Sequence, residues 1–269
     1  MTSFFETPHS RIAYTDSGPP GAHAILLLHG FPLSSGVFDV LLPELTSTFR
    51  VITPDMPGFG QSSTVGPFSM TSIARDCVAL MTSLKIGSFA AAGLSMGGYV
   101  ALEMAASFRD LLSHLILIDT KASADDETAR DNRDSFVRVV REKGGRAIVD
   151  LMMPKMLAPT SNQLAVHPRE QELRDIMQQI SPLTIEYASC AMRDRRDFTA
   201  LLASMGLKTQ VIVGEHDAII SLAVAKQTAD ACGERGARLD IIPDAGHMAP
   251  FESPVQVAKV MREFLITSA

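Results

Sequence analysis

The chain of 269 residues has few cysteines, no excess of basic residues and no long apolar run. Cys77, Cys190 and Cys232 are odd in number, widely spaced and form no CxxC pair, which argues against a disulfide framework or a structural zinc site. Lysine and arginine (24) are outnumbered by aspartate and glutamate (30), so the net charge is −6. A surface of this kind predicts no binding to nucleic acid or to an anionic membrane. The longest apolar runs, such as Ala24–Leu28, are far too short to span a bilayer.

The N-terminal residues Met1–Glu6 lack a basic stretch followed by an apolar run, so no secretory signal is expected and the predicted location is the cytoplasm. Apolar residues (46%) and charged residues (20%) stand in the proportions of an ordinary globular chain. The length predicts one large domain or one domain with an insertion. The expected assembly is a monomer or a homodimer.

Short apolar runs bounded by Gly, Pro or Asp alternate with segments of helical periodicity. Runs that are apolar on nearly every residue are typical of strands buried on both faces of a parallel sheet. The predicted strands are Ala24–Leu28, Arg50–Thr53, Ser88–Gly93, Leu115–Ile118, Gln210–Val213 and Arg238–Ile242. The predicted helices between and after them are Met70–Leu84, Gly97–Phe108 and Pro254–Leu265. This alternation predicts an α/β fold with a mostly parallel central sheet flanked by helices.

The segment 121–203 interrupts this alternation, because it contains many charged residues and no convincing buried strand. We interpret it as a helical insertion, or cap, between core segments 1–120 and 204–269. Its predicted helices are Glu127–Lys143, Arg146–Met153, Arg169–Ile180, Pro182–Met192 and Phe198–Ser204. The methionine-rich stretch Leu151–Leu157 either lines a pocket or packs inside the cap.

The motif Gly93–Gly98, with the sequence GLSMGG, places Ser95 between a predicted strand and a predicted helix. A serine on such a sharp turn projects its hydroxyl beyond the carboxyl edge of the sheet, and the small neighbours Gly93 and Gly97 permit the turn. We therefore predict that Ser95 is a nucleophile. The N–H groups of Met96, directly after it, and of Phe31, in the loop at the end of the first long strand, are the predicted oxyanion donors.

A serine nucleophile needs a base, and a histidine base needs an acid to orient it. His247 follows the last predicted strand and is the predicted base, with His29 as the alternative. Asp217 follows the penultimate strand and is the predicted acid, with Asp119 as the serious rival. Other acids at strand ends or in the same loops are Asp55, Glu215 and Asp244.

With these motifs, the chain resembles the α/β-hydrolase superfamily over nearly its whole length. The resemblance includes the order Ser, Asp, His, and it implies a helical cap over the site. It looks most like the small esterases, enol-lactonases and perhydrolases that use no cofactor and no metal. Dehalogenase and epoxide hydrolase chemistry is not expected, because those enzymes carry Asp where Ser95 stands. The matching segments are His29–Pro32, Asp55–Ser62, Gly93–Gly97, Gly214–Asp217, Gly246–His247 and the helix that begins at Pro254.

These observations predict a serine hydrolase that cleaves a small or medium neutral carboxylic ester or lactone through an acyl-enzyme, with that small molecule as its partner. The alternatives with the same three residues are a C–C bond hydrolase and a perhydrolase. A third alternative, from another class, is a ligand receptor with very slow turnover.

Overall fold

The computed structural model describes residues 1–159, 167–233 and 236–267. Within these ranges nine strands form one sheet, in the order β1-β2-β4-β3-β6-β7-β8-β9, with β5 paired to β2. The strands are β1 (Ser3–Glu6), β2 (Ser10–Ser17), β3 (Ala24–Leu28), β4 (Arg50–Pro54), β5 (Ser63–Thr64), β6 (Phe89–Leu94), β7 (Leu112–Ile118), β8 (Lys208–Gly214) and β9 (Arg238–Ile242). Pairings among β3, β4 and β6 to β9 are parallel, which confirms the predicted α/β fold with a mostly parallel sheet.

The antiparallel strands β1, β2 and β5 at one side of the sheet are the part that the sequence pattern did not predict. β2 mixes buried Ile12 and Ala13 with exposed Arg11, and β1 is mostly exposed. Neither strand has the continuous apolar run that marks a strand covered on both faces.

Helices cover both faces of the sheet. Neighbouring residues of a strand point to opposite faces, and in the central strands both sets are apolar and need to be covered. In β3, Leu26 and Leu28 belong to one apolar cluster, whereas Ile25 and Leu27 belong to the other. The first face is covered by α2 (Met70–Ser83), α3 (Met96–Ser107), α8 (Thr199–Met205) and α9 (Leu222–Asp230). The second is covered by α1 (Leu42–Leu45), α10 (Ala249–Glu252), α11 (Pro254–Thr267) and the short helix η1 (Ser35–Phe38).

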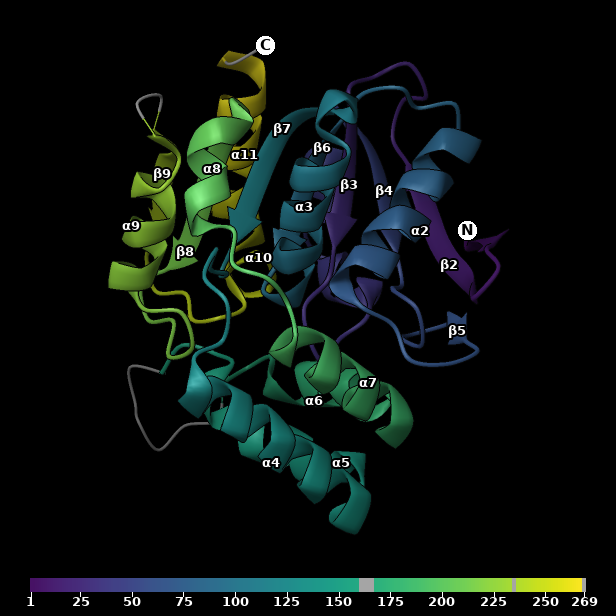
Figure 1. Cartoon of the computed structure of the whole chain (residues 1–269). Coiled ribbons are helices and arrows are strands. Elements are labelled where there is room, and N and C mark those ends of the chain that lie inside the picture. Colours follow the sequence, from purple (N-terminus) through teal and green to yellow (C-terminus); the bar gives the residue numbers. More distant parts are fainter. Residues whose placement is uncertain (160–166, 234–235, 268–269) are drawn as a thin grey trace.

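Four helices of the predicted insertion lie together at the end of the sheet to which the parallel strands point (Figure 1). They are α4 (Glu127–Lys143), α5 (Gly145–Met152), α6 (Glu170–Gln178) and α7 (Pro182–Arg193), with the short helix η3 (Met153–Lys155) after α5. Helix α8, which overlaps the end of the predicted insertion, lies beside the sheet and contacts α3. The division at residues 121 and 203 stays a prediction, and its residues 160–166, like 234–235 and 268–269 of the predicted core, lie outside the described residues.

The parallel register brings the ends of the central strands to one level. Leu28 pairs with Gly93, Leu94 with Ile118, and Gly214 with Ile242. The loops that follow these strands therefore meet at one edge of the sheet, under the four helices α4 to α7. Among the described residues, every helix is too short or too polar to cross a bilayer.

Candidate active site

Ser95 lies on the turn between β6 and α3 and has φ 51° and ψ −111°, a conformation that non-glycine residues rarely adopt. The turn is tight enough to require glycine nearby. A Cβ on Gly93 would lie 2.2 Å from the carbonyl oxygen of Gly97, and one on Gly97 would lie 2.2 Å from the carbonyl oxygen of Leu28. The turn leaves Ser95 half-buried, whereas its immediate neighbours are buried.

Three side chains from distant parts of the chain form one line of hydrogen bonds. The Nε2 atom of His247 lies 3.0 Å from Oγ of Ser95, and its Nδ1 atom lies 2.9 Å from Oδ2 of Asp217. The side chains of His247 and Asp217 are 2% and 0% exposed, so water is largely excluded from the ion pair they can form. The hydroxyl of Ser95 is the more accessible end of the line, where a substrate can approach.

The hydrogen bonds of Asp217 hold its carboxylate in place and determine which ring nitrogen of His247 carries the proton. Its Oδ1 atom accepts hydrogen bonds from the backbone N–H groups of Ile219 (2.7 Å) and Ile220 (2.9 Å). Its Oδ2 atom is left for Nδ1–H of His247, and the lone pair of Nε2 then faces the Ser95 hydroxyl. This arrangement allows His247 to accept the serine proton while Asp217 stabilises the resulting imidazolium.

His29, the alternative base, is fully buried, and both of its ring nitrogens are engaged elsewhere. Nδ1 donates to the carbonyl of Gly30 (2.8 Å), and Nε2 accepts from the backbone N–H of Met56 (3.0 Å). Burial lowers the pKa of His29, which favours the neutral ring that this pair of bonds requires. The structure therefore does not bring His29 to Ser95 as a base.

Asp119, the rival acid, also has both oxygens engaged away from the histidine ring. Its carboxylate accepts from the backbone N–H groups of Gly214 (2.8 Å) and Ala249 (3.2 Å). The pKa of Asp119 is raised well above its ordinary value, chiefly by complete burial and then by the charge of Asp217. Asp119 thus connects the end of β8, which precedes Asp217, with the start of α10, which follows His247.

Of the two predicted oxyanion donors, Met96 directly follows Ser95, and Phe31 follows a glycine that lies close to it. A Cβ on Gly30 would lie 3.3 Å from Cβ of Ser95, so the loop that continues to Phe31 runs against the serine. Met96 is the first residue of α3, and N–H groups in a first helical turn have no acceptor within the helix. The N–H of Met96 therefore has no helical acceptor beside Ser95, and the N–H of Phe31 stays the predicted second donor.

Glu252 is a buried acid near the site that the sequence reasoning missed. Its carboxylate accepts from the backbone N–H groups of Gly246 (2.8 Å) and Met248 (3.3 Å), on either side of His247, and of Ala158 (2.7 Å). Burial raises its pKa. Its position five residues after His247, in the short helix α10, is the one signal for it in the sequence.

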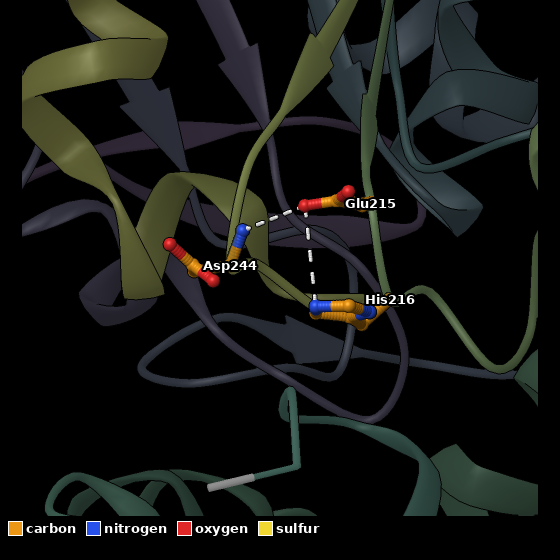
Figure 2. A group of neighbouring side chains, drawn as sticks. All are labelled: Glu215, His216 and Asp244. Atoms are coloured by element: carbon orange, nitrogen blue, oxygen red, sulfur yellow. Dashed lines mark hydrogen bonds and ion pairs between the residues drawn. The ribbon is translucent and has the colours of Figure 1, made fainter. Parts of the chain in front are cut away.

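Glu215, His216 and Asp244 form the one group within the described ranges with metal-ligand types and spacing. One ligand atom from each lies within 4.8 Å of the others. The carboxylate of Glu215 lies between the ring of His216 (3.9 Å) and the backbone N–H of Asp244 (3.3 Å), as Figure 2 shows. All three residues are exposed, unlike buried Asp217 and His247 beside them in sequence. Exposure therefore distinguishes this group from the line of hydrogen bonds that ends at Ser95.

Comparisons with known proteins identify the family of the chain. The model of the alpha/beta hydrolase family matches residues 25–260, so the chain belongs to this family. A thermophilic esterase from Thermogutta terrifontis, determined with malate bound, has 33% sequence identity and a TM-score of 0.91, and the match covers 100% of this chain and 99% of that one.

Curated relatives of the chain are also named as hydrolases. Lipase LipV of Mycobacterium tuberculosis is 26% identical over 264 residues, which cover 92% of this chain and 95% of LipV. An uncharacterized hydrolase of Saccharomyces cerevisiae is 35% identical over 108 residues, and this match spans only 39% of this chain and 37% of the yeast protein. Together these similarities support a hydrolase function.

Proposed function

We propose that the protein is a serine hydrolase that cleaves carboxylic esters through an acyl-enzyme. The observation that carries the proposal is the line of hydrogen bonds from Ser95 through His247 to Asp217. The similarity to the Thermogutta terrifontis esterase over the whole chain supports esters as the substrate class.

In the first half-reaction, Oγ of Ser95 bonds to the ester carbonyl carbon while Nε2 of His247 takes the hydroxyl proton. The negative charge that develops on the carbonyl oxygen is held by the N–H groups of Phe31 and Met96. The bond to the alcohol then breaks, and the alkoxide leaves with the proton from His247. In the second half-reaction, water attacks the acyl-enzyme by the same proton transfers and releases the acid.

The experiment is hydrolysis of 4-nitrophenyl butyrate by the wild-type chain and by Ser95→Ala. Loss of the nucleophile is expected to lower kcat by about three to six orders of magnitude with an unchanged circular dichroism spectrum. The control is Ser47→Ala, because Ser47 is exposed. A fluorophosphonate should label the wild-type chain at Ser95, as read by peptide mass. Full turnover by Ser95→Ala would overturn the proposal.

A further inference from the structure

A cavity of about 340 Å³ opens between α4, η3 and the loops that follow β7 and β8. This volume is within the range of sites for small molecules. One part of its wall is apolar and includes Phe136, Ile219 and Ile220. Another part carries charged side chains, which are Lys121, Arg133, Lys155 and Asp125. A wall with these two parts matches a ligand that has an alkyl segment and one charged end.

The charged part of the wall is positive, although the whole chain carries −6. The side chain of Asp125 is 1% exposed and lies between Lys121 (3.5 Å), Arg133 (3.1 Å) and Arg195 (2.8 Å). Burial opposes its ionisation, but Arg133 and Arg195 outweigh burial and hold the pKa of Asp125 below its ordinary value. One ionised carboxylate thus stands against three cationic side chains in the described lining, which leaves two positive charges uncompensated.

The cavity adjoins the proposed site along three segments of the chain. Lys121 follows Thr120, whose hydroxyl donates to the carbonyl of Ser95 (2.8 Å). Ala218 in the cavity wall follows Asp217 directly. Tyr99, also in the wall, lies one helical turn after Ser95 in α3. The described lining does not include Ser95 or His247, so a substrate whose ester lies at Ser95 has to extend along these segments to place its far end in the cavity.

We propose that this cavity binds a carboxylate, so that the preferred substrates are monoesters of aliphatic dicarboxylic acids rather than neutral esters. The free carboxylate pairs with Lys121 and Lys155, and the alkyl chain contacts the apolar wall beside Ile219. This inference rests on the proposed function. It differs from the sequence-based expectation of a neutral ester, because the fold gathers charged side chains of the segment 121–203 in this cavity.

The first experiment compares matched esters in a pH-stat. Monoethyl esters of the C4 to C8 diacids are each paired with the ethyl ester in which a methyl group replaces the carboxylate, such as monoethyl adipate with ethyl hexanoate. At the chain length that reaches the cavity, kcat/KM should favour the charged ester by about tenfold or more, and the preference should fall with added salt. No preference for the charged ester at any length would overturn the inference.

The second experiment tests whether Lys121 and Lys155 are the residues that bind the carboxylate of the substrate. Lys121→Gln and Lys155→Gln should each lower the ratio of kcat/KM for charged over neutral ester by about three- to tenfold. Lys226→Gln is the control, because Lys226 is exposed on α9 and paired with Asp230 outside the cavity. An unchanged ratio in both Lys121→Gln and Lys155→Gln would contradict the proposed binding site.

Binding measured without turnover separates this inference from the proposed function. In the Ser95→Ala chain, calorimetry should detect tighter binding of monoethyl adipate than of ethyl hexanoate, and adding Lys155→Gln should reduce the difference. Equal binding of the two esters would overturn the charge preference. Hydrolysis of neutral esters without any charge preference would refute only this inference, whereas charge-selective binding without Ser95-dependent turnover would refute only the proposed function.

Discussion

The carboxylate of Glu252 holds the backbone on both sides of His247. It accepts from the N–H groups of Gly246 and Met248, and its other oxygen accepts from Ala158 in the segment after η3. A Cβ on Gly246 would lie 2.5 Å from the backbone nitrogen of Ala158, so this segment packs directly on the loop that carries the histidine. The orientation of His247 therefore depends on contacts with the predicted insertion as well as on Asp217.

Replacing Glu252 tests this dependence. Glu252→Gln keeps the size of the side chain but puts an NH₂ group where an oxygen accepts from backbone N–H groups. We expect kcat for 4-nitrophenyl butyrate to fall by about tenfold or more, because a misplaced base slows proton transfer. Glu263→Gln is the matched control, since Glu263 is exposed on α11 and pairs with Arg238. Equal kinetics of the two variants would show that Glu252 does not position the histidine.

The identity of the acid can be tested with two isosteric substitutions. Asp217→Asn should lower kcat by about 10⁴-fold, because an amide disfavours the tautomer that leaves Nε2 free to accept the serine proton. Asp119→Asn should retain far more activity, because Asp119 bonds to the backbone at Gly214 and Ala249 and not to the ring. The measurement is kcat on one chromogenic ester. The opposite order of the two variants would move the acid to the end of β7.

The raised pKa of Asp119 predicts a pH dependence of stability. The folded state binds the proton of Asp119 more tightly than the unfolded chain does, so this group favours folding at low pH. That contribution is lost as the pH rises from the ordinary carboxyl range through the raised pKa. The free energy of unfolding in urea should therefore fall with pH more steeply in the wild-type chain than in Asp119→Asn. Parallel curves would argue against an uncharged Asp119 in the folded protein.

His29 is expected to affect catalysis through the oxyanion donor. Its Nδ1–H group bonds to the carbonyl of Gly30, which belongs to the same peptide unit as the N–H of Phe31. His29→Ala frees this peptide unit and should lower kcat by about 10- to 100-fold, with a smaller change in KM. His29→Asn, which can keep a donor toward Gly30, should recover part of the loss. A base role would instead predict that both variants are as inactive as His247→Ala.

The tight turn at Ser95 makes a prediction about stability. A methyl group at Gly97 would overlap the carbonyl oxygen of Leu28, so Gly97→Ala should destabilise the fold by about 3 kcal/mol or more. Gly87→Ala is the control, because nothing lies within 4 Å of the position of its Cβ. The measurement is the urea midpoint of each variant. Similar midpoints for both would show that the turn can relax around the added methyl.

Much of the fold was predictable because its signals are local. The six parallel strands end within a few residues of their predicted ends, and Glu127–Lys143 forms α4 as predicted, with Asp126 as its N-cap. Strands β1, β2 and β5 and helix α9 were not predicted from the sequence. Strand β2, for example, gains its place from antiparallel pairing with β4 and not from its own apolar pattern. For the methionine-rich stretch Leu151–Leu157 the sequence allows either a pocket lining or packing, and the structure buries Met153 and Met156 in an apolar cluster.

The sequence by itself determined the turn at Ser95, because glycines spaced around a serine between a strand and a helix allow little else. It also placed two histidines, His29 and His247, and several acids at strand ends. Only the tertiary structure decided which of them meet, since 152 residues separate Ser95 from His247 and 30 separate His247 from Asp217. The same holds for the cavity beside Lys121, because burial and charge at a site arise from segments that are brought together only when the chain is folded.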